Sequence, residues 1–263
     1  MIIDTHCHLT YLSDEELDAQ IKRAVDAGVK KMICIGGCDN LEGSKRAAEI
    51  SDLYPEIFFS VGIHPMDAGN TVQLDEIAFL ANHPKCVGIG ETGLDYYWGE
   101  SPEDQQKELF LKSIQLAKNV DKPLIIHCRG EKDNPERCIE DTLKIIQDNF
   151  DSRVRGVFHC YWGDSVLAKR LAELNFSVSF PGTVTFKNAK DLRDGLLQIP
   201  LSQIMVETDA PYLTPEPFRG KPCEPWHTKL TLEKIANIFE KSDAEMARIT
   251  TENAIRLFGL ADQ

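Results

Sequence analysis

Eight short apolar runs recur along the chain, with segments of helical character between them. Near-continuous apolar runs are typical of parallel strands that are buried on both faces. The runs cover residues 1–4, 31–36, 57–63, 86–91, 124–128, 154–160, 176–180 and 204–208. Eight strand–helix units predict an α/β fold, a TIM (β/α)8 barrel, which takes about 250 residues. A doubly wound sheet is the alternative, because the number of strands does not decide whether a sheet closes.

Helix signals lie in the segments between the runs. Ser13 stands three residues before Glu16, which is the spacing of a capping box, and Gly28 suits the position after a helix end. Ser101 and Pro102 predict an N-cap followed by a first helical residue. The tail after residue 225 predicts two closing helices, and its segment TTENA (250–254) reads as a helix start.

The chain shows no low-complexity stretch, linker or short-period repeat, so we expect a single domain over residues 1–263. No run approaches the roughly 18 apolar residues of a membrane span. The first residues lack the basic region and apolar core of a secretory signal. Eight scattered cysteines without a CxxC pair are typical of reduced thiols. We therefore expect a cytoplasmic protein without membrane contact, and no obligate protein partner is evident.

The formal net charge of −13 restricts the partners of the chain. A strongly acidic protein does not attract a polyanion over long distances, which argues against a high-affinity, sequence-specific DNA binder. Nucleic acid held locally at a metal site remains compatible with this charge, because the bound cations supply positive charge there.

The segment DTHCHL (4–9) places two histidines, His6 and His8, directly after the first apolar run. In a strand, residues two apart point to the same face, so Asp4 would share that face with both imidazoles. Two neighbouring neutral imidazoles make half of a metal site. The alternative is a pair of surface histidines at the start of the chain.

Six residues that can bind a metal fall at or just past the carboxyl ends of the predicted strands. They are His6 and His8 after the first run, Glu91 after the fourth, His127 after the fifth, His159 after the sixth and Asp209 after the eighth. In a TIM barrel this rim carries the active site. Packing alone does not explain six such residues on one rim.

Four imidazoles and two carboxylates exceed the needs of one tetrahedral ion, so we expect two divalent ions with Glu91 between them. Nitrogen and oxygen donors suit zinc, manganese or nickel and, less well, magnesium. Two adjacent ions would acidify a bridging water, and Asp209 would orient that water and take its proton. Asp4 and Glu207 lie one pleat below His6 and Asp209, where they would accept a hydrogen bond from a ligating imidazole and fix its tautomer.

An ordered set of motifs carries a resemblance to a known family. The motifs are DTHCHL, VGIHP, GETGLDYY, LIIHCR, HCYWG, SFPGTVTFKNA, ETDAPYLTP, FRGKPCEP and TTENAIRLFGL. They resemble those of the TatD family of metal-dependent deoxyribonucleases, within the amidohydrolase-like barrels, from residue 2 to about residue 260. The resemblance implies a metallo-dependent TIM barrel with two metal ions that hydrolyses nucleic-acid phosphodiesters. It also implies His6, His8, Glu91 and Asp209 as ligands of one ion, and Glu91, His127 and His159 as ligands of the other.

Two segments depart from the family pattern on the side that faces a substrate. HCRGEKDNPERC (127–138) replaces the family's shorter HSRDA, and EPWHT (224–228) replaces a small residue and a tyrosine after EP. Candidate substrate-binding residues on this rim are His64, Arg129, Arg219 and Lys221, and Lys187 is a further candidate for holding phosphate. Aromatic residues that would stack bases are Tyr96, Tyr97, Trp98, Tyr161 and Trp162, and packing beneath the loops is the alternative for each.

Three functions follow from these residues. The first is a deoxyribonuclease that cuts DNA phosphodiesters at single-stranded ends, with Asp209 and Glu91 as catalytic residues. The second keeps the metal site and hydrolyses esters or amides, as in deacylation of aminoacyl-tRNA, because a fold does not choose a substrate. The third is a non-enzymatic binding protein, against which the complete set of ligands argues.

Overall fold

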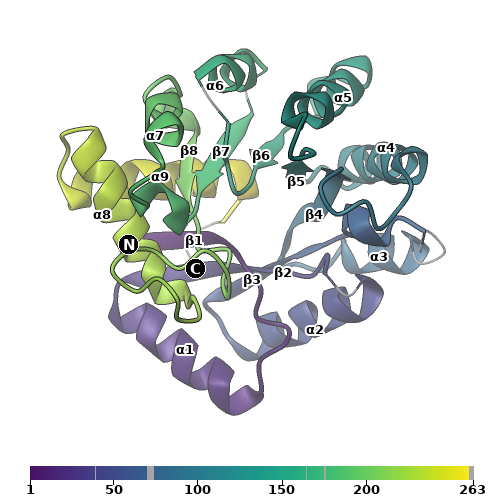
Figure 1. The fold of residues 1–263 in the computed structure, drawn as a ribbon. Helices are drawn as coiled ribbons and strands as arrows, with labels where there is room; N and C mark the ends of the chain where they lie inside the picture. Colours follow the sequence, from purple (N-terminus) through teal and green to yellow (C-terminus); the bar gives the residue numbers. More distant parts are fainter. Residues whose placement is uncertain (39, 70–73, 164, 175, 261–263) are drawn as a thin grey trace. The chain divides into compact units, whose positions relative to one another are not determined.

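The computed structural model describes residues 1–38, 40–69, 74–163, 165–174 and 176–260. Contacts between residues divide the chain into two compact units. The terminal unit comprises Met1–Cys34 and His159–Gln263, and the central unit comprises Ile35–Phe158. In Figure 1 the terminal unit holds the purple start and the green and yellow end of the chain.

The terminal unit is built on parallel strands from both ends of the chain. They are β1 (Ile2–Cys7), β2 (Val29–Ile35), β7 (Ser177–Phe180) and β8 (Ile204–Val206). Their order is β7, β8, β1, β2, and a parallel bridge between Cys7 and Ala210 joins the last segment to the first. This order brings the residues after β8 beside the end of β1.

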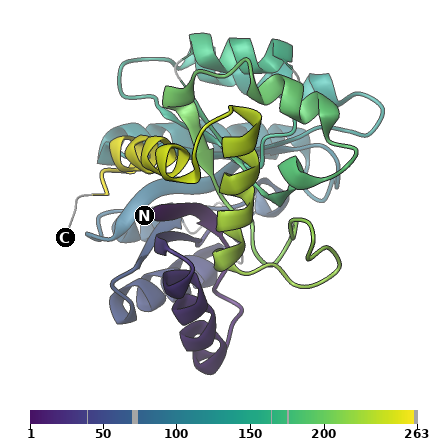
Figure 2. The ribbon, with the colours of Figure 1, turned by 90° about the vertical axis from the view of Figure 1, so that its left-hand side faces the viewer.

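The described part of this unit also contains helices. They are α1 (Asp14–Asp26), α6 (Ser165–Glu173), α7 (Lys190–Leu196), α8 (Thr228–Ile238) and α9 (Asp243–Phe258). The yellow helix α9 packs on β1 and β8, and Figure 2 shows it alongside the purple first strand. The side chain of Asn253 donates hydrogen bonds to the carbonyls of Leu201 and Ile204, while Thr251 donates to the carbonyl of Met1. The last helix therefore fixes the first and last strands together.

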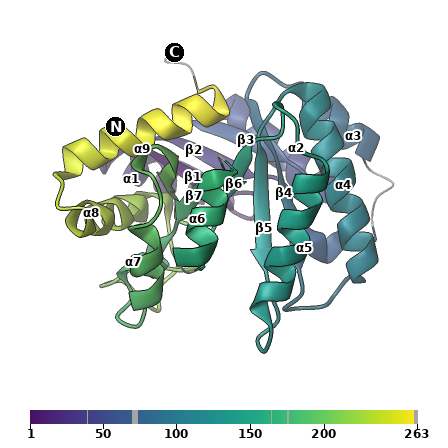
Figure 3. The ribbon, with the colours of Figure 1, turned by 90° about the horizontal axis from the view of Figure 1, so that it is seen from above.

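The central unit contains four parallel strands in chain order. They are β3 (Ile57–Val61), β4 (Cys86–Asp95), β5 (Leu124–Arg129) and β6 (Gly156–Phe158). Its helices are α2 (Asn40–Leu53), α3 (Leu74–Leu80), α4 (Glu103–Val120) and α5 (Pro135–Asp148). Helices α2, α4 and α5 pack on β3, β4 and β5, and Figure 3 shows α4 and α5 beside the last two.

Each of the eight predicted runs overlaps a strand, but the strand bounds place several site residues differently. His6 lies inside β1, and Glu91 lies inside β4 rather than at its end. Strand β4 continues because Thr92–Asp95 pairs with Ile126–Arg129 of β5. Asp209 follows the short strand β8 at some distance, instead of ending it.

Two of the predicted helix starts are wrong. Helix α4 has Pro102 as its N-cap, because the Ser101 hydroxyl donates to the carbonyl of Met66 at 2.5 Å and does not cap the helix. The threonines of TTENA lie inside α9, which begins after Ser242 with a hydrogen bond from the Glu245 amide to the Ser242 hydroxyl.

The capping box of α1 is confirmed. Ser13 accepts a hydrogen bond from the amide of Glu16, and the Glu16 carboxylate accepts one from the amide of Ser13 at 3.0 Å. We expect Ser13→Ala to lower the free energy of unfolding by about 1 kcal/mol, because it leaves an amide of the first turn without its acceptor. Urea unfolding followed by circular dichroism measures this loss. Lys22→Ala, in the exposed middle of the same helix, is the control and should change stability by less than about 0.5 kcal/mol. An unchanged midpoint for Ser13→Ala would show that the box contributes nothing.

Within the described ranges, no helix combines the length and apolar character needed to cross a bilayer. The expectation of one domain over residues 1–263 stays a prediction.

Candidate metal centre

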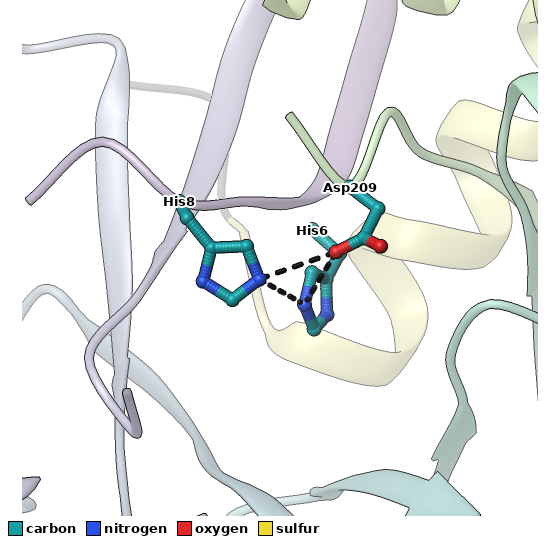
Figure 4. Close-up of side chains that lie close together, drawn as sticks. All are labelled: His6, His8 and Asp209. Atoms are coloured by element: carbon teal, nitrogen blue, oxygen red, sulfur yellow. Dashed lines mark hydrogen bonds and ion pairs between the residues drawn. The ribbon is translucent and has the colours of Figure 1, made fainter. Parts of the chain in front are cut away.

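Backbone hydrogen bonds bring His6, His8 and Asp209 together in the terminal unit. The amide of Asp209 donates to the carbonyl of His6 at 2.8 Å, and the amide of His8 donates to the carbonyl of Ala210 at 2.8 Å. The segment after β8 therefore runs beside the end of β1. Figure 4 shows the two imidazoles and the carboxylate converging from these two segments.

The donor atoms of these three residues have the spacing of metal ligands. The Nε2 atoms of His6 and His8 lie 3.3 Å apart, and Asp209 Oδ1 lies 3.6 Å and 3.2 Å from them, respectively. A tetrahedral ion with bonds of about 2.0–2.1 Å holds its ligand atoms about 3.3–3.4 Å apart. The three side chains fit a divalent cation between them.

A second group of donors in this unit shares His6. The rings of His6 and His159 are stacked with centroids 3.9 Å apart, and His159 Nδ1 lies 3.7 Å from Glu207 Oε1. His6, His159 and Glu207 form a cluster of buried potential ligands. Glu207 Oε2 is buried and has no hydrogen-bond partner among the described residues. A cation would satisfy this oxygen, so Glu207 lies among the potential ligands rather than only behind them.

Asp209 is held as an ionised carboxylate. Burial favours its neutral form, but the hydrogen bond from His8 and the electrostatic interaction with the neighbouring imidazoles outweigh burial and lower the pKa of Asp209. Its backbone has a φ of 57°, in the left-handed region. This conformation is unfavourable for a residue other than glycine and persists only where the surrounding structure holds it. Such residues are frequent at functional sites.

Asp4 contacts backbone and a hydroxyl. It accepts hydrogen bonds from the amide of His6 at 3.3 Å, the amide of Thr208 at 3.0 Å and the hydroxyl of Thr208 at 2.6 Å. Burial raises the pKa of Asp4 to about 7. Asp4 thus ties the end of β8 to β1 and supports the position of His6 through the main chain.

In the central unit, Glu91 and His127 form a direct pair. Glu91 Oε1 lies 2.6 Å from His127 Nδ1 and 3.5 Å from His64 Nε2. These three side chains form a further cluster of potential ligands. The pair forms because β4 and β5 are neighbours. Gly93 of β4 is paired with His127 of β5, and Glu91 lies two residues before Gly93 on the same strand.

Asp95 completes this cluster and was not predicted. Its Oδ2 atom lies 2.9 Å from His127 Nε2, on the side of the ring away from Glu91. Although burial opposes it, the hydrogen bond to His127 lowers the pKa of Asp95. A carboxylate on one ring nitrogen fixes the other as the metal-facing lone pair. A signal was present in the sequence, since Glu91, Gly93 and Asp95 alternate along one strand and share a face.

His64 caps a short helix with one ring nitrogen and faces Glu91 with the other. Its Nδ1 accepts a hydrogen bond from the amide of Met66 at 3.2 Å and caps the short helix η1 (Pro65–Asp67). With Nδ1 as acceptor, the neutral ring carries its proton on Nε2, the atom nearest Glu91. His64 is therefore better placed to donate a hydrogen bond from Nε2 than to bind a metal through that atom.

Three predicted substrate-binding cations lie exposed on aromatic rings. The guanidinium of Arg129 lies 4.1 Å from the ring centre of Tyr97, and that of Arg219 lies 3.7 Å from Phe186. The ammonium of Lys221 lies 5.7 Å from Phe218. Because these three side chains are exposed and are held in place on aromatic rings, they are suited to contact an anionic ligand.

The candidate stacking aromatics divide by exposure. Tyr96 and Tyr161 are buried, so their faces are not accessible to a base. Tyr97, Trp98 and Trp162 are exposed by 44%, 55% and 42%, so their faces remain accessible. The aromatic Tyr212, 61% exposed and edge-on to His8, was not predicted at all.

The donor sets are now placed within each unit. The terminal unit brings His6, His8, His159, Glu207 and Asp209 together, and the central unit brings His64, Glu91, Asp95 and His127 together. The sharing of Glu91 between two ions, and the division of ligands that follows from it, stay predictions.

Comparisons with known proteins show the family. A family model described as TatD related DNase matches residues 3–259. The metal-dependent hydrolase YabD of Bacillus subtilis is 41% identical, over 98% of this chain and 99% of its own. The metal-dependent hydrolase YcfH of Escherichia coli is 34% identical, over 98% and 95%.

A solved structure shows the fold class. The crystal structure of YjjV, a TatD homolog from Escherichia coli, matches with a TM-score of 0.88 at 25% identity, over 99% of this chain and 98% of that one. The predicted α/β TIM barrel is confirmed, and the doubly wound alternative is excluded. The chain therefore belongs to the family of TatD-related DNases and is a metal-dependent hydrolase.

Proposed function

We propose that the protein hydrolyses DNA phosphodiester bonds at single-stranded ends with two divalent ions, which are zinc, manganese or magnesium. The main observation that supports this proposal is that the donor atoms of His6, His8 and Asp209 converge at the spacing of metal ligands. The choice of DNA is supported by the description of the family.

The residues that would hold the ions are those of the two clusters. They are His6, His8, His159 and Asp209, with Glu207 added by the structure, and Glu91 and His127 in the central unit. Bound there, divalent ions supply an acidified water and stabilise negative charge on the phosphate and on the departing oxygen.

The protein's own groups supply orientation and proton transfer. The ionised Asp209 orients the attacking water and accepts its proton. Asp95 holds the ring of His127 against Glu91. His64 presents its Nε2–H group on the same side as Glu91 and suits a hydrogen bond to a phosphate oxygen of the substrate.

The rival activity is hydrolysis of acyl esters or amides at the same centre. Deacylation requires a pocket for a side chain, whereas phosphodiester cleavage requires cations beside the metals. The loop that begins at Arg129 differs from the family pattern. It carries the exposed guanidinium of Arg129 stacked on Tyr97, and this observation favours an anionic substrate.

The test compares substrate classes with one enzyme preparation. We expect end-labelled single-stranded DNA to be shortened stepwise with magnesium, manganese or zinc and to stay intact in chelator. Aminoacyl esters and amides should be hydrolysed at least about 100-fold more slowly, as for a substrate that leaves polar groups of the site unpaired. Stoichiometric metal binding without DNA cleavage, together with rapid ester hydrolysis, would replace this proposal with the deacylase.

A further inference from the structure

Next to the Glu91–His127 pair, the central unit presents two exposed aromatic rings and an arginine. The rings of Tyr97 and Trp98 meet edge to face with centroids 5.0 Å apart. The guanidinium of Arg129 lies over both, 4.1 Å from the ring centre of Tyr97 and 5.4 Å from that of Trp98. We call these three residues the aromatic platform.

The position of the platform is fixed by a buried hydrogen-bond network. Asp95 Oδ1 accepts from the amides of Tyr97 and Trp98 at 2.9 Å and 3.0 Å, while its Oδ2 faces His127. The buried side chain of Gln106 in α4 accepts from the Asp95 amide at 2.8 Å and donates to the Asp95 carbonyl at 2.9 Å. One carboxylate therefore holds both a potential metal ligand and the aromatic turn.

Arg137, a second arginine of this region, has a structural role and differs from Arg129 in its ion pairs. Arg137 also lies on a tyrosine, 4.5 Å from the ring centre of Tyr96, but it is paired with Glu103 and Glu131. Arg129 has no carboxylate within ion-pair distance in the described part of the chain. Its charge is free to meet an anion, although the net charge of the protein is −13.

We propose that the platform binds one unpaired nucleotide of the substrate, with the base stacked on the exposed ring of Trp98, which Tyr97 supports edge to face, and the phosphate contacted by Arg129. A nucleotide joins a planar ring to an anion, which is the pairing that the platform presents. A base inside a duplex keeps its faces covered by its neighbours, so the platform selects single strands. This inference rests on the proposed nuclease function and adds the means by which unpaired ends are chosen.

Equilibrium binding tests the platform without hydrolysis. Fluorescence anisotropy, in chelator and at low salt, compares a labelled oligothymidylate with the same strand made abasic. Stacking of a base on an aromatic contributes about 1–3 kcal/mol, so wild type should prefer the base-bearing strand on the order of 10-fold. The double variant Tyr97→Ala/Trp98→Ala should lose this preference. Phe150→Ala, whose ring is 51% exposed in the same unit, should keep it.

The arginine has its own readout. Arg129→Gln should weaken binding of both strands and reduce the slope of log affinity against log salt by about one, because one phosphate contact is lost. Arg248→Gln, an exposed arginine of α9 in the terminal unit, removes the same charge and should leave the slope unchanged.

The outcomes separate the platform from the nuclease. Equal wild-type affinity for the two strands, or a preference that survives in the double variant, would overturn the platform. A base preference that the double variant loses, in a protein that cleaves neither strand when metal is added, would support the platform and overturn the nuclease.

Discussion

Asp209→Asn is expected to lower kcat for cleavage of single-stranded DNA by about 100- to 10,000-fold, the range for loss of a general base. The amide keeps the size of the side chain and one of its oxygens, but it has neither the negative charge nor the capacity to take a proton. Its hydrogen bond with His8 Nε2, now 3.2 Å long, can persist, because the amide offers an oxygen that accepts and an NH2 group that donates. Single-turnover rates on end-labelled strands, with magnesium, manganese and zinc in turn, measure the loss.

The control for this variant is Asp26→Asn, an exposed aspartate near the end of α1 in the same unit. It removes the same charge and should leave kcat unchanged. Metal content after dialysis separates loss of the ion from loss of the base. Wild-type rates in Asp209→Asn at full metal occupancy would remove Asp209 from the chemistry.

Gly93→Ala is expected to destabilise the protein by about 4 kcal/mol or more, which is at the extreme of single substitutions. A Cβ atom at Gly93 would lie 2.0 Å from the backbone carbonyl oxygen of His127, and the φ of 137° is itself unfavourable for alanine. Strand β5 would have to move away from β4 at the position of a potential metal ligand. Urea unfolding followed by circular dichroism measures the loss of stability.

Gly28→Ala separates backbone strain from this collision. Gly28 has a φ of 97°, but no heavy atom lies within 4 Å of a Cβ placed there. Its cost should therefore be about 1–2 kcal/mol, from backbone conformation alone. Equal costs for the two variants would show that β5 yields to the extra methyl group without penalty.

Features of the fold that depend only on residues close in sequence could be predicted from the sequence. The capping box of Ser13 and Glu16 and the glycine after α1 depend on residues three or four positions apart, and the structure contains both. The period of two along β1 placed His6 and His8 on one side, because successive side chains of a strand alternate. Neither result needs information from outside its own segment.

Helix starts and strand ends were less readable, because distant groups compete for the same atoms. Ser101 has the chemistry of an N-cap, yet its hydroxyl donates to Met66, on a different segment. Strand β4 extends to Asp95 only because β5 offers partners that far. The local preference of a residue does not show which distant group will form a hydrogen bond with it in the folded protein.

The sequence by itself determined the alternation of strands and helices, the family motifs and the residues that can bind a metal. Only the tertiary structure decided which donors meet within each unit. Asp209 reaches His6 and His8 because β8 and β1 are neighbours, although they lie near opposite ends of the chain. Asp95 faces His127 through the register of β4 with β5, and Asp4 binds Thr208 rather than an imidazole. Periodicity specifies the face on which a side chain lies, whereas strand order and register specify which side chain it meets.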